Sequence, residues 1–224
     1  MSIEKIFFLC DAPEFAQLRL QDPSTTTMEG LIAFNKHILF VMTIIVVLVA
    51  WLLFATVSNY DEFNTPKSQS FFHSNALEIV WTSLPALTLL NLASPSFTLL
   101  YSMDEISTPE ISVKIIGHQW YWSYEISDFD TMATCMDSDK TLKYTCYLLT
   151  EESISQKNYL GFFRLLETNK RVLLPSNTHL RLLVTSVDVL HSWTIPSFGV
   201  KVDACPGRLN QVNVFLKRIG MFFG

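Results

Sequence analysis

Two long runs of apolar residues lie in the first half of the chain, and a polar stretch separates them. The first run, residues 38–57, contains no charged side chain, and about twenty helical residues are what roughly 30 Å of hydrocarbon requires. The second run, residues 79–100, is interrupted by two prolines and an asparagine. Membrane helices tolerate such interruptions where neighbouring helices satisfy the backbone. The pattern predicts a transmembrane hairpin over residues 37–103, with its second helix packed against another protein.

Residues 1–36 are predicted to form an N-terminal arm that leads into the first helix. The apolar run at 6–9 is too short to cross a bilayer and makes a poor signal peptide. The polar stretch that follows has turn chemistry at Asp22-Pro23 and a helix start near residues 27–29. We therefore expect an extended arm on the surface that enters the helix at this point.

The second half of the chain, residues 104–224, changes to short segments with the period of a β-strand. Apolar and polar side chains alternate at 179–185 and at 212–217, and the segment 112–116 is also strand-like. No periodic segment of helix length interrupts these strands. Their spacing predicts a small β-sandwich or barrel.

The region between these strands is harder to assign. Residues 130–158 are polar and irregular, which predicts long loops. Regular structure is expected to resume at 162–166 and again at 171–174, because both segments are rich in large apolar side chains.

Composition agrees with a membrane-anchored protein that carries one domain. Hydrophobic residues make up 49% of the 224 residues and charged residues 17%, so a lipid bilayer is an expected partner. The net charge of −5 makes a nucleic-acid partner unlikely on physical grounds, because a polyanion requires a basic face. The cysteines form no CxxC pair, which does not support a local thiolate metal site and leaves a long-range disulfide open: Cys10, Cys135, Cys146 and Cys205.

Four aromatic residues in five follow Gln119, in the stretch GHQWYWSYE. They fit an aromatic strand that packs on both of its faces. They equally fit an exposed platform that serves as a binding surface or an electron port. Aspartates follow closely, and an acidic rim would attract a cationic partner unless it is only a solvated loop: Asp128, Asp130, Asp137 and Asp139.

Two further residues have both a functional and a structural interpretation. Glu78 precedes the second apolar run, where a carboxylate either accepts protons for a path into the membrane or complements the helix dipole. His191 lies between Leu190 and Ser192-Trp193, and Gly and Pro turns follow it as far as Asn210. A single histidine is either a hydrogen-bonded core residue or a metal ligand, and without a nearby partner it is a weak metal signal.

Several motifs together resemble subunit II of the haem–copper terminal oxidases, of the mitochondrial cytochrome c oxidase type. They cover nearly the whole chain in the order of the family: QDPSTTTMEG, EIVWTSLPALTLL, PSFTLLYSMDE, GHQWYWSYE, RLLETNKRVLLP, VTSVDVLHSW and IPSFGVKVDACPGRLNQVNVFLKRIGMFFG. The resemblance implies a two-helix membrane hairpin that carries a cupredoxin-like all-β barrel. It also implies the mitochondrial inner membrane as the location, with the barrel in the intermembrane space.

The resemblance implies a function and a role for each candidate residue. The family accepts electrons from cytochrome c at the dinuclear copper centre CuA and passes them to subunit I, which holds the haems and CuB and couples oxygen reduction to proton pumping. His191 resembles a CuA ligand, Trp120 the electron entry point, and Glu78 the entrance of a proton pathway. The docking face for cytochrome c would include Tyr121, Glu125, Asp128 and Asp130.

One departure from the family concerns the copper ligands. In the family, a loop of the pattern CSEICGxxHxxM follows FFG and supplies two bridging thiolates, a carbonyl, the second histidine and a methionine. The sequence ends at Gly224, where that loop would begin. We expect a split subunit, in which a second polypeptide supplies the copper loop and completes the barrel, because an uncompleted edge is prone to aggregation. The alternatives are a structural or assembly subunit without copper and, less favoured because His191 and Trp120 are retained, a quinol-oxidising relative.

Overall fold

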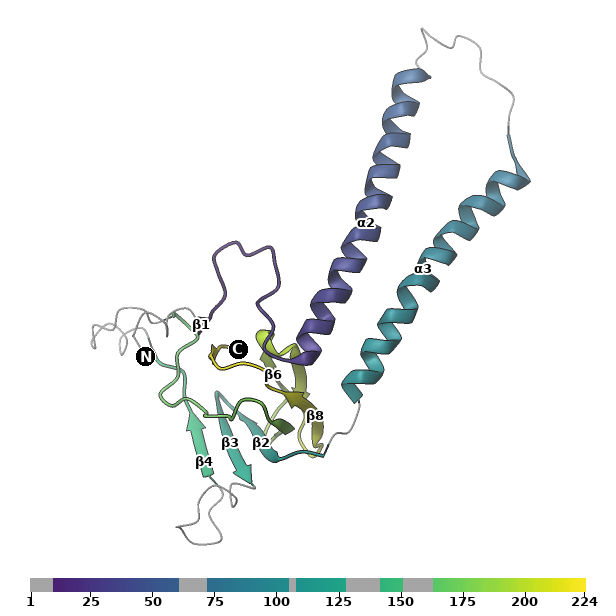
Figure 1. Ribbon diagram of the computed structural model, residues 1–224. Helices are drawn as coiled ribbons and strands as arrows, with labels where there is room; N and C mark the ends of the chain where they lie inside the picture. Colours follow the sequence, from purple (N-terminus) through teal and green to yellow (C-terminus); the bar gives the residue numbers. More distant parts are fainter. Residues whose placement is uncertain (1–9, 61–71, 105–107, 128–141, 151–162) are drawn as a thin grey trace. The chain divides into compact units, whose positions relative to one another are not determined.

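The computed structural model describes most of the chain, and its α-helices and β-strands are shown in Figure 1. The described residues are 10–60, 72–104, 108–127, 142–150 and 163–224. They belong to two compact units, of which one comprises Ile32–Leu100 and the other combines Met1–Leu31 with Tyr101–Gly224. The predicted docking residues Asp128 and Asp130 lie outside the described residues.

Two long helices account for the apolar runs. They are α2 (Thr26–Asn59) and α3 (Asn75–Asp104), and both are long and apolar enough to cross a membrane. Each extends beyond the apolar run that predicted it, because capping groups set a helix end whereas hydropathy marks only the apolar part. Pro85 and Pro95 lie inside α3, and Thr88 donates a hydrogen bond to the carbonyl of Pro85.

A five-stranded sheet forms the larger part of the β-unit, with the strand order β4-β3-β2-β5-β8. The strands are β2 (Ile111–His118), β3 (Tyr121–Ser127), β4 (Leu142–Cys146), β5 (His179–Ser186) and β8 (Asn210–Phe215). β2 and β5 are parallel, and the other neighbours in the sheet are antiparallel.

An antiparallel hairpin packs over β2 and β5 of this sheet. It consists of β6 (His191–Ile195) and β7 (Val200–Ala204), which are joined by the short 3-10 helix η2 (Pro196–Phe198). Gly199 ends η2 with a φ of 67°, a conformation that favours glycine. Near the chain ends, β1 (Cys10–Asp11) pairs in parallel with β9 (Met221–Phe222).

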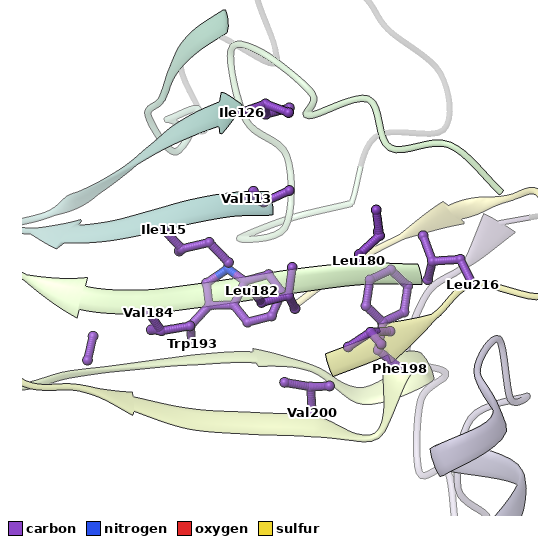
Figure 2. Packing of buried hydrophobic residues seen from close by; sticks show 12 residues of the cluster. Val113, Ile115, Ile126, Leu180, Leu182, Val184, Trp193, Phe198, Val200 and Leu216 are labelled. Atoms are coloured by element: carbon purple, nitrogen blue, oxygen red, sulfur yellow. The ribbon is translucent and has the colours of Figure 1, made fainter. Parts of the chain in front are cut away.

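The hydrophobic core lies between the sheet and the hairpin. Along β5, every second residue is buried, as the alternation at 179–185 predicts. Figure 2 shows Trp193, Phe198 and Val200 from the hairpin facing residues of the sheet. Each fully buried aliphatic side chain contributes about 1.5–3 kcal/mol, and the core members from β2, β5 and β8 include Val113, Ile115, Leu180, Leu182, Val184 and Val214.

Two assignments made from the sequence are wrong. β4 lies inside the segment predicted to be irregular, because pairing with the distant strand β3 recruits it. The segments 163–166 and 171–174 form turns and irregular backbone rather than strands. Val172 and Leu174 still pack against the core, so their apolar character reflects burial without a ladder of strand hydrogen bonds.

The end of the N-terminal arm is buried, which also differs from the predicted surface arm. Ser24 and Thr25 are almost fully buried. The Ser24 hydroxyl donates to the carbonyl of Ser197, and the Thr25 hydroxyl donates to that of Phe198. Thr25 also caps α2 by accepting a hydrogen bond from the Met28 amide. The start of α2 is therefore anchored to η2, whereas residues 13–20 are exposed.

Candidate metal centre

His191 is the first residue of β6, and its imidazole is enclosed on several sides. It pairs with Ala204 of β7, which is fully buried. Trp122 approaches the ring edge-on, with the two ring centroids 5.9 Å apart. Gly117 of β2 lies against the same ring, because a Cβ at Gly117 would be 3.0 Å from His191 Cδ2 and 3.1 Å from Trp122. A side chain at this position would therefore push the ring or the indole aside by a few tenths of an ångström.

The carboxylate of Asp188 also contacts the imidazole. His191 Nε2 lies 2.7 Å from Asp188 Oδ1. An ionised carboxylate only accepts hydrogen bonds, so Nε2 carries the hydrogen and donates it. This hydrogen bond is the main reason why the pKa of the Asp188 carboxyl lies well below its usual range. In the neutral imidazole, the lone pair then lies on Nδ1, which is the nitrogen that remains for a metal.

Asp188 did not emerge from the sequence as a functional residue. A signal was present, because a carboxylate often accepts a hydrogen bond from the second ring nitrogen of a metal-binding histidine, and Asp188 lies three residues before His191. In the sequence VDVLH, however, the same spacing also fits a turn in which the aspartate only binds backbone amides. The amide of Val189 does donate to Asp188 Oδ1, at 2.7 Å.

His191 fits a metal centre as one nitrogen ligand, and the rest of the ligand set is not found near it. Among the described residues, no three His, Cys, Asp or Glu side chains cluster in a way that could hold a metal ion. A bridged copper pair needs thiolates. Cys146 and Cys205 are both free thiols, and burial raises the pKa of Cys146, which disfavours its thiolate.

The aromatic cluster after Gln119 divides between the surface and the core. Trp120 is 89% exposed. Tyr121 stacks on His118, with ring centroids 4.5 Å apart, and also contacts Tyr147. Trp122 and Tyr124 of β3 instead pack against the core. Both interpretations of the sequence therefore describe part of the cluster. Trp120 lies in the turn before β3, and within β3 Tyr121 faces the opposite side from Trp122 and Tyr124.

Tyr124 has a polar partner inside the core. The indole nitrogen of Trp193 donates a hydrogen bond of 3.2 Å to the Tyr124 hydroxyl. Burial raises the pKa of Tyr124 to about 12, an effect that outweighs the opposing one of this hydrogen bond. The phenol is therefore kept neutral over the whole physiological range.

Glu125 lies between two lysines rather than on an acidic surface. Its carboxylate is 3.0 Å from Lys143 Nζ and 3.8 Å from Lys114 Nζ. The hydrogen bond from Lys143 is the main reason why the pKa of Glu125 is lowered. With two cations around one anion, this part of the sheet surface is locally positive, so any docking role of Glu125 has to overcome both lysines.

Glu78 lies in the first turn of α3, within the helical unit. Its side chain is about half exposed, and a carboxylate oxygen is 3.8 Å from Nδ1 of His73. A shallow surface pocket is lined by Glu78 together with Asn75, Ile79 and Thr82, which occupy one face of the helix. The carboxylate is thus accessible to water at the end of a helix that is able to cross a membrane.

Comparison with known proteins identifies the family. Residues 111–224 match the family model described as cytochrome c oxidase subunit II, periplasmic domain, and residues 13–99 match the corresponding transmembrane domain. Cytochrome c oxidase subunit 2 of Phytophthora megasperma is 47% identical over 99% of this chain and 80% of that protein. The mitochondrial subunit 2 of Vigna unguiculata is 45% identical over 96% of this chain and 55% of that protein.

A solved structure is also similar to the β-unit. The periplasmic domain of cytochrome oxidase subunit II from Bradyrhizobium japonicum has 30% sequence identity, with a TM-score of 0.42 over 54% of this chain and 73% of that one. The two family models together account for both helices and for the β-domain. The chain belongs to the cytochrome c oxidase subunit II family, whose members are components of the terminal oxidase complex.

Proposed function

We propose that this subunit accepts electrons from cytochrome c at a CuA centre and passes them to subunit I for oxygen reduction coupled to proton pumping. The observation that carries the proposal is the hydrogen bond at Nε2 of His191. Its Nε2 is engaged by Asp188 at 2.7 Å, which leaves Nδ1 for a metal. Copper, when bound, supplies the reversible one-electron change, and the haems and CuB belong to subunit I.

Trp120 is the proposed point of electron entry. It is the most exposed aromatic residue near His191 among the described residues, at 89%. An exposed, rigid indole gives a partner a large contact area at low entropic cost. The proposed docking face around it comprises Tyr121 and Glu125 together with Asp128 and Asp130.

The remaining copper ligands come, in this proposal, from polypeptide outside these 224 residues. Support comes from the hairpin: His191 is held ready for a metal, yet the described residues offer no cluster of further ligands. One version of the proposal places these ligands on a second chain. Denaturing electrophoresis and mass spectrometry of the purified oxidase test this version, because a single polypeptide containing both His191 and the copper loop would contradict it.

The proposed location is the mitochondrial inner membrane, with the β-domain in the intermembrane space. The mitochondrial subunit 2 of Vigna unguiculata and the two membrane-length helices support it. In this orientation Glu78, near the start of α3, faces the opposite side of the membrane from the β-domain, because the helix lies between them in the sequence. A role for Glu78 at the entrance of a proton pathway agrees with its exposure.

Substitution of the proposed ligand tests the copper proposal. In the purified oxidase, His191→Ala should abolish the CuA near-infrared band and electron paramagnetic resonance signal, while the subunit stays in the complex. His179→Ala is the matched control, because His179 is at the opposite end of β5 from the site, and it should keep both signals. Unchanged copper signals in His191→Ala would refute the ligand assignment.

The second candidate function is a structural or assembly subunit that binds no copper. The lack of a ligand cluster among the described residues favours it. The same spectra of the unmodified oxidase decide between the two functions. A complex that contains this subunit but shows no CuA signal would establish the structural role.

A further inference from the structure

We infer that Asp188 is a positioning residue that ties the Trp120 turn to the His191 imidazole through its two carboxylate oxygens. Its role toward the metal rests on the proposed function. Its role toward the two protein segments rests on geometry alone. The inference assigns a specific task to a side chain that the sequence did not single out.

The two oxygens of Asp188 face different segments of the chain. Oδ1 accepts the hydrogen of His191 Nε2 at 2.7 Å. Oδ2 accepts the backbone N–H of Gln119 at 2.8 Å, across 69 positions of sequence. Gln119 is bonded directly to Trp120, so one carboxylate connects the exposed indole to the enclosed imidazole by two hydrogen bonds and one peptide unit.

Asp188 is itself held in place, so it can act as a fixed support. The amide of Val189 donates to Oδ1 at 2.7 Å. The hydroxyl of Ser186, which is buried, lies 3.1 Å from the same oxygen. The Val187 amide bonds to the carbonyl of Gly117 at 3.2 Å, which joins the Asp188 loop to the end of β2. A carboxylate with this many donors has little freedom to turn.

Holding both segments requires a carboxylate, because each of its two oxygens must accept a hydrogen bond. Asparagine has nearly the same shape but presents one acceptor oxygen and one NH2 donor. In Asp188→Asn the NH2 would face either the Gln119 N–H or the His191 Nε2–H, and two donors would oppose each other. One connection is therefore lost while the volume of the side chain is preserved.

The first experiment uses the whole chain in detergent without metal, with nitrogen-15 in its histidines. Nuclear magnetic resonance reports which ring nitrogen of His191 carries the hydrogen, and His191→Ala assigns the signal. The unmodified chain should show the Nε2–H form. Asp188→Asn should shift the ring toward the Nδ1–H form where its NH2 faces His191, or speed hydrogen exchange of the Gln119 amide where its NH2 faces Gln119. Asp203→Asn, the control, removes the same charge from an exposed position on β7 and should change nothing.

The second experiment separates positioning from electrostatic docking in the assembled oxidase. Asp188→Asn should lower kcat with cytochrome c about tenfold, as changes to the partners of metal-binding histidines do, and leave KM within the range of Asp203→Asn. The copper resonance signal should also change in shape. A higher KM with unchanged kcat would mean that Asp188 acts as a docking charge, and it would overturn the inference.

The outcomes keep the two proposals apart. A Nδ1–H form in the unmodified chain, or an Asp188→Asn variant that changes neither the His191 ring nor the Gln119 amide, overturns the inference even where His191→Ala has removed copper. Copper that survives His191→Ala refutes the copper proposal, and the metal-free spectra still decide whether Asp188 holds the ring. If Asp188→Asn does not fold, an Nδ1–H form in the unmodified chain still overturns the inference, and slow hydrogen exchange of its Gln119 amide supports it.

Discussion

At the scale of single residues, close contacts restrain the His191 ring on several sides. The His191 ring lies between Trp122, Gly117 and the Asp188 carboxylate. The indole and the glycine restrain the plane of the ring, and the carboxylate accepts the hydrogen of Nε2. A histidine that binds metal gains from such restraint, because less order has to be imposed on binding.

Tyr124 provides a prediction about pH at this scale. Its pKa is raised to about 12 by burial, so the folded chain holds the phenol proton more tightly than the unfolded chain, where the pKa is near 10. The stability contributed by the neutral phenol is fully present below pH 10 and is lost as the pH rises toward 12. The loss amounts to roughly 3 kcal/mol, at 1.4 kcal/mol per pKa unit.

Ultraviolet titration of tyrosinate in the folded chain measures this effect. A late titration step should be present in the unmodified chain and absent from Tyr124→Phe. Tyr147→Phe, which removes a tyrosine that is about half exposed, should leave the late step in place. A late step that persists in Tyr124→Phe would show that another phenol is responsible.

Trp120 provides a second prediction for a single side chain. Because the indole is 89% exposed, Trp120→Phe removes little packing and should leave the fold intact. In the proposed role it should slow electron entry severalfold while the binding of cytochrome c changes much less. Rapid-mixing kinetics of the assembled oxidase measures both quantities.

The control for this change is Trp51→Phe, the same replacement at an exposed position of α2 in the apolar run. It should affect neither electron entry nor binding. Unaltered turnover in Trp120→Phe would remove the entry role from Trp120. A large loss of binding with unaltered electron entry would reassign it to docking.

At the scale of elements, the junction between the arm and the first helix is more than a connection. Thr25 ends the arm, caps α2 and donates to the carbonyl of Phe198 in η2. Lys217, which follows β8, forms an ion pair with Glu29 in the first turn of α2. Gly199 also allows close approach, since a Cβ there would be 2.8 Å from Leu31. The start of α2 and the turn after β6 therefore form one packed element.

Removal of one hydroxyl tests this element. Thr25→Val keeps the shape of the side chain but leaves the buried Phe198 carbonyl and Met28 amide without partners, which should cost about 1–3 kcal/mol. Thermal unfolding of the detergent-solubilised chain, followed by tryptophan fluorescence, should show a lower midpoint. Thr25→Ser, which keeps the hydroxyl, should restore most of it.

The matched control is Thr43→Val on the same helix. Its hydroxyl donates to the carbonyl of Leu39 within α2 and is exposed, so its loss should be close to neutral. If Thr43→Val and Thr25→Val lower the midpoint equally, the arm does not stabilise the β-domain through Thr25.

At the scale of the whole molecule, charged side chains lie on the sheet surface, and large apolar side chains lie along the two helices. The chain has a net charge of −5, yet the sheet surface around Glu125 carries Lys114 and Lys143 and is locally positive. The helices expose large apolar side chains along most of their length, which suits lipid or other membrane subunits. In the proposed docking face, a cationic partner therefore meets the two lysines beside Glu125, and the other members of that face have to supply the attraction.

Much of the architecture was predictable because it rests on local periodicity. An uncharged run of twenty residues is enough to predict the first membrane helix, and alternation at 179–185 predicts β5 with every second residue buried. Motifs in family order predicted the family. β4 was missed because its five residues have no strong alternation, and only pairing with β3 makes them a strand.

The sequence by itself determined the two membrane-length helices, the strand β5, the family and the candidate His191. Tertiary structure alone decided how that histidine is held. Gln119, Asp188 and His191 meet across 69 positions of chain, and no local pattern records a contact between residues so far apart. It also separated Trp120, on the surface, from Trp122, against the imidazole. Residues two apart in a strand share a face, so alternation does not separate these two side chains. The turn before β3, which contains Trp120, separates them.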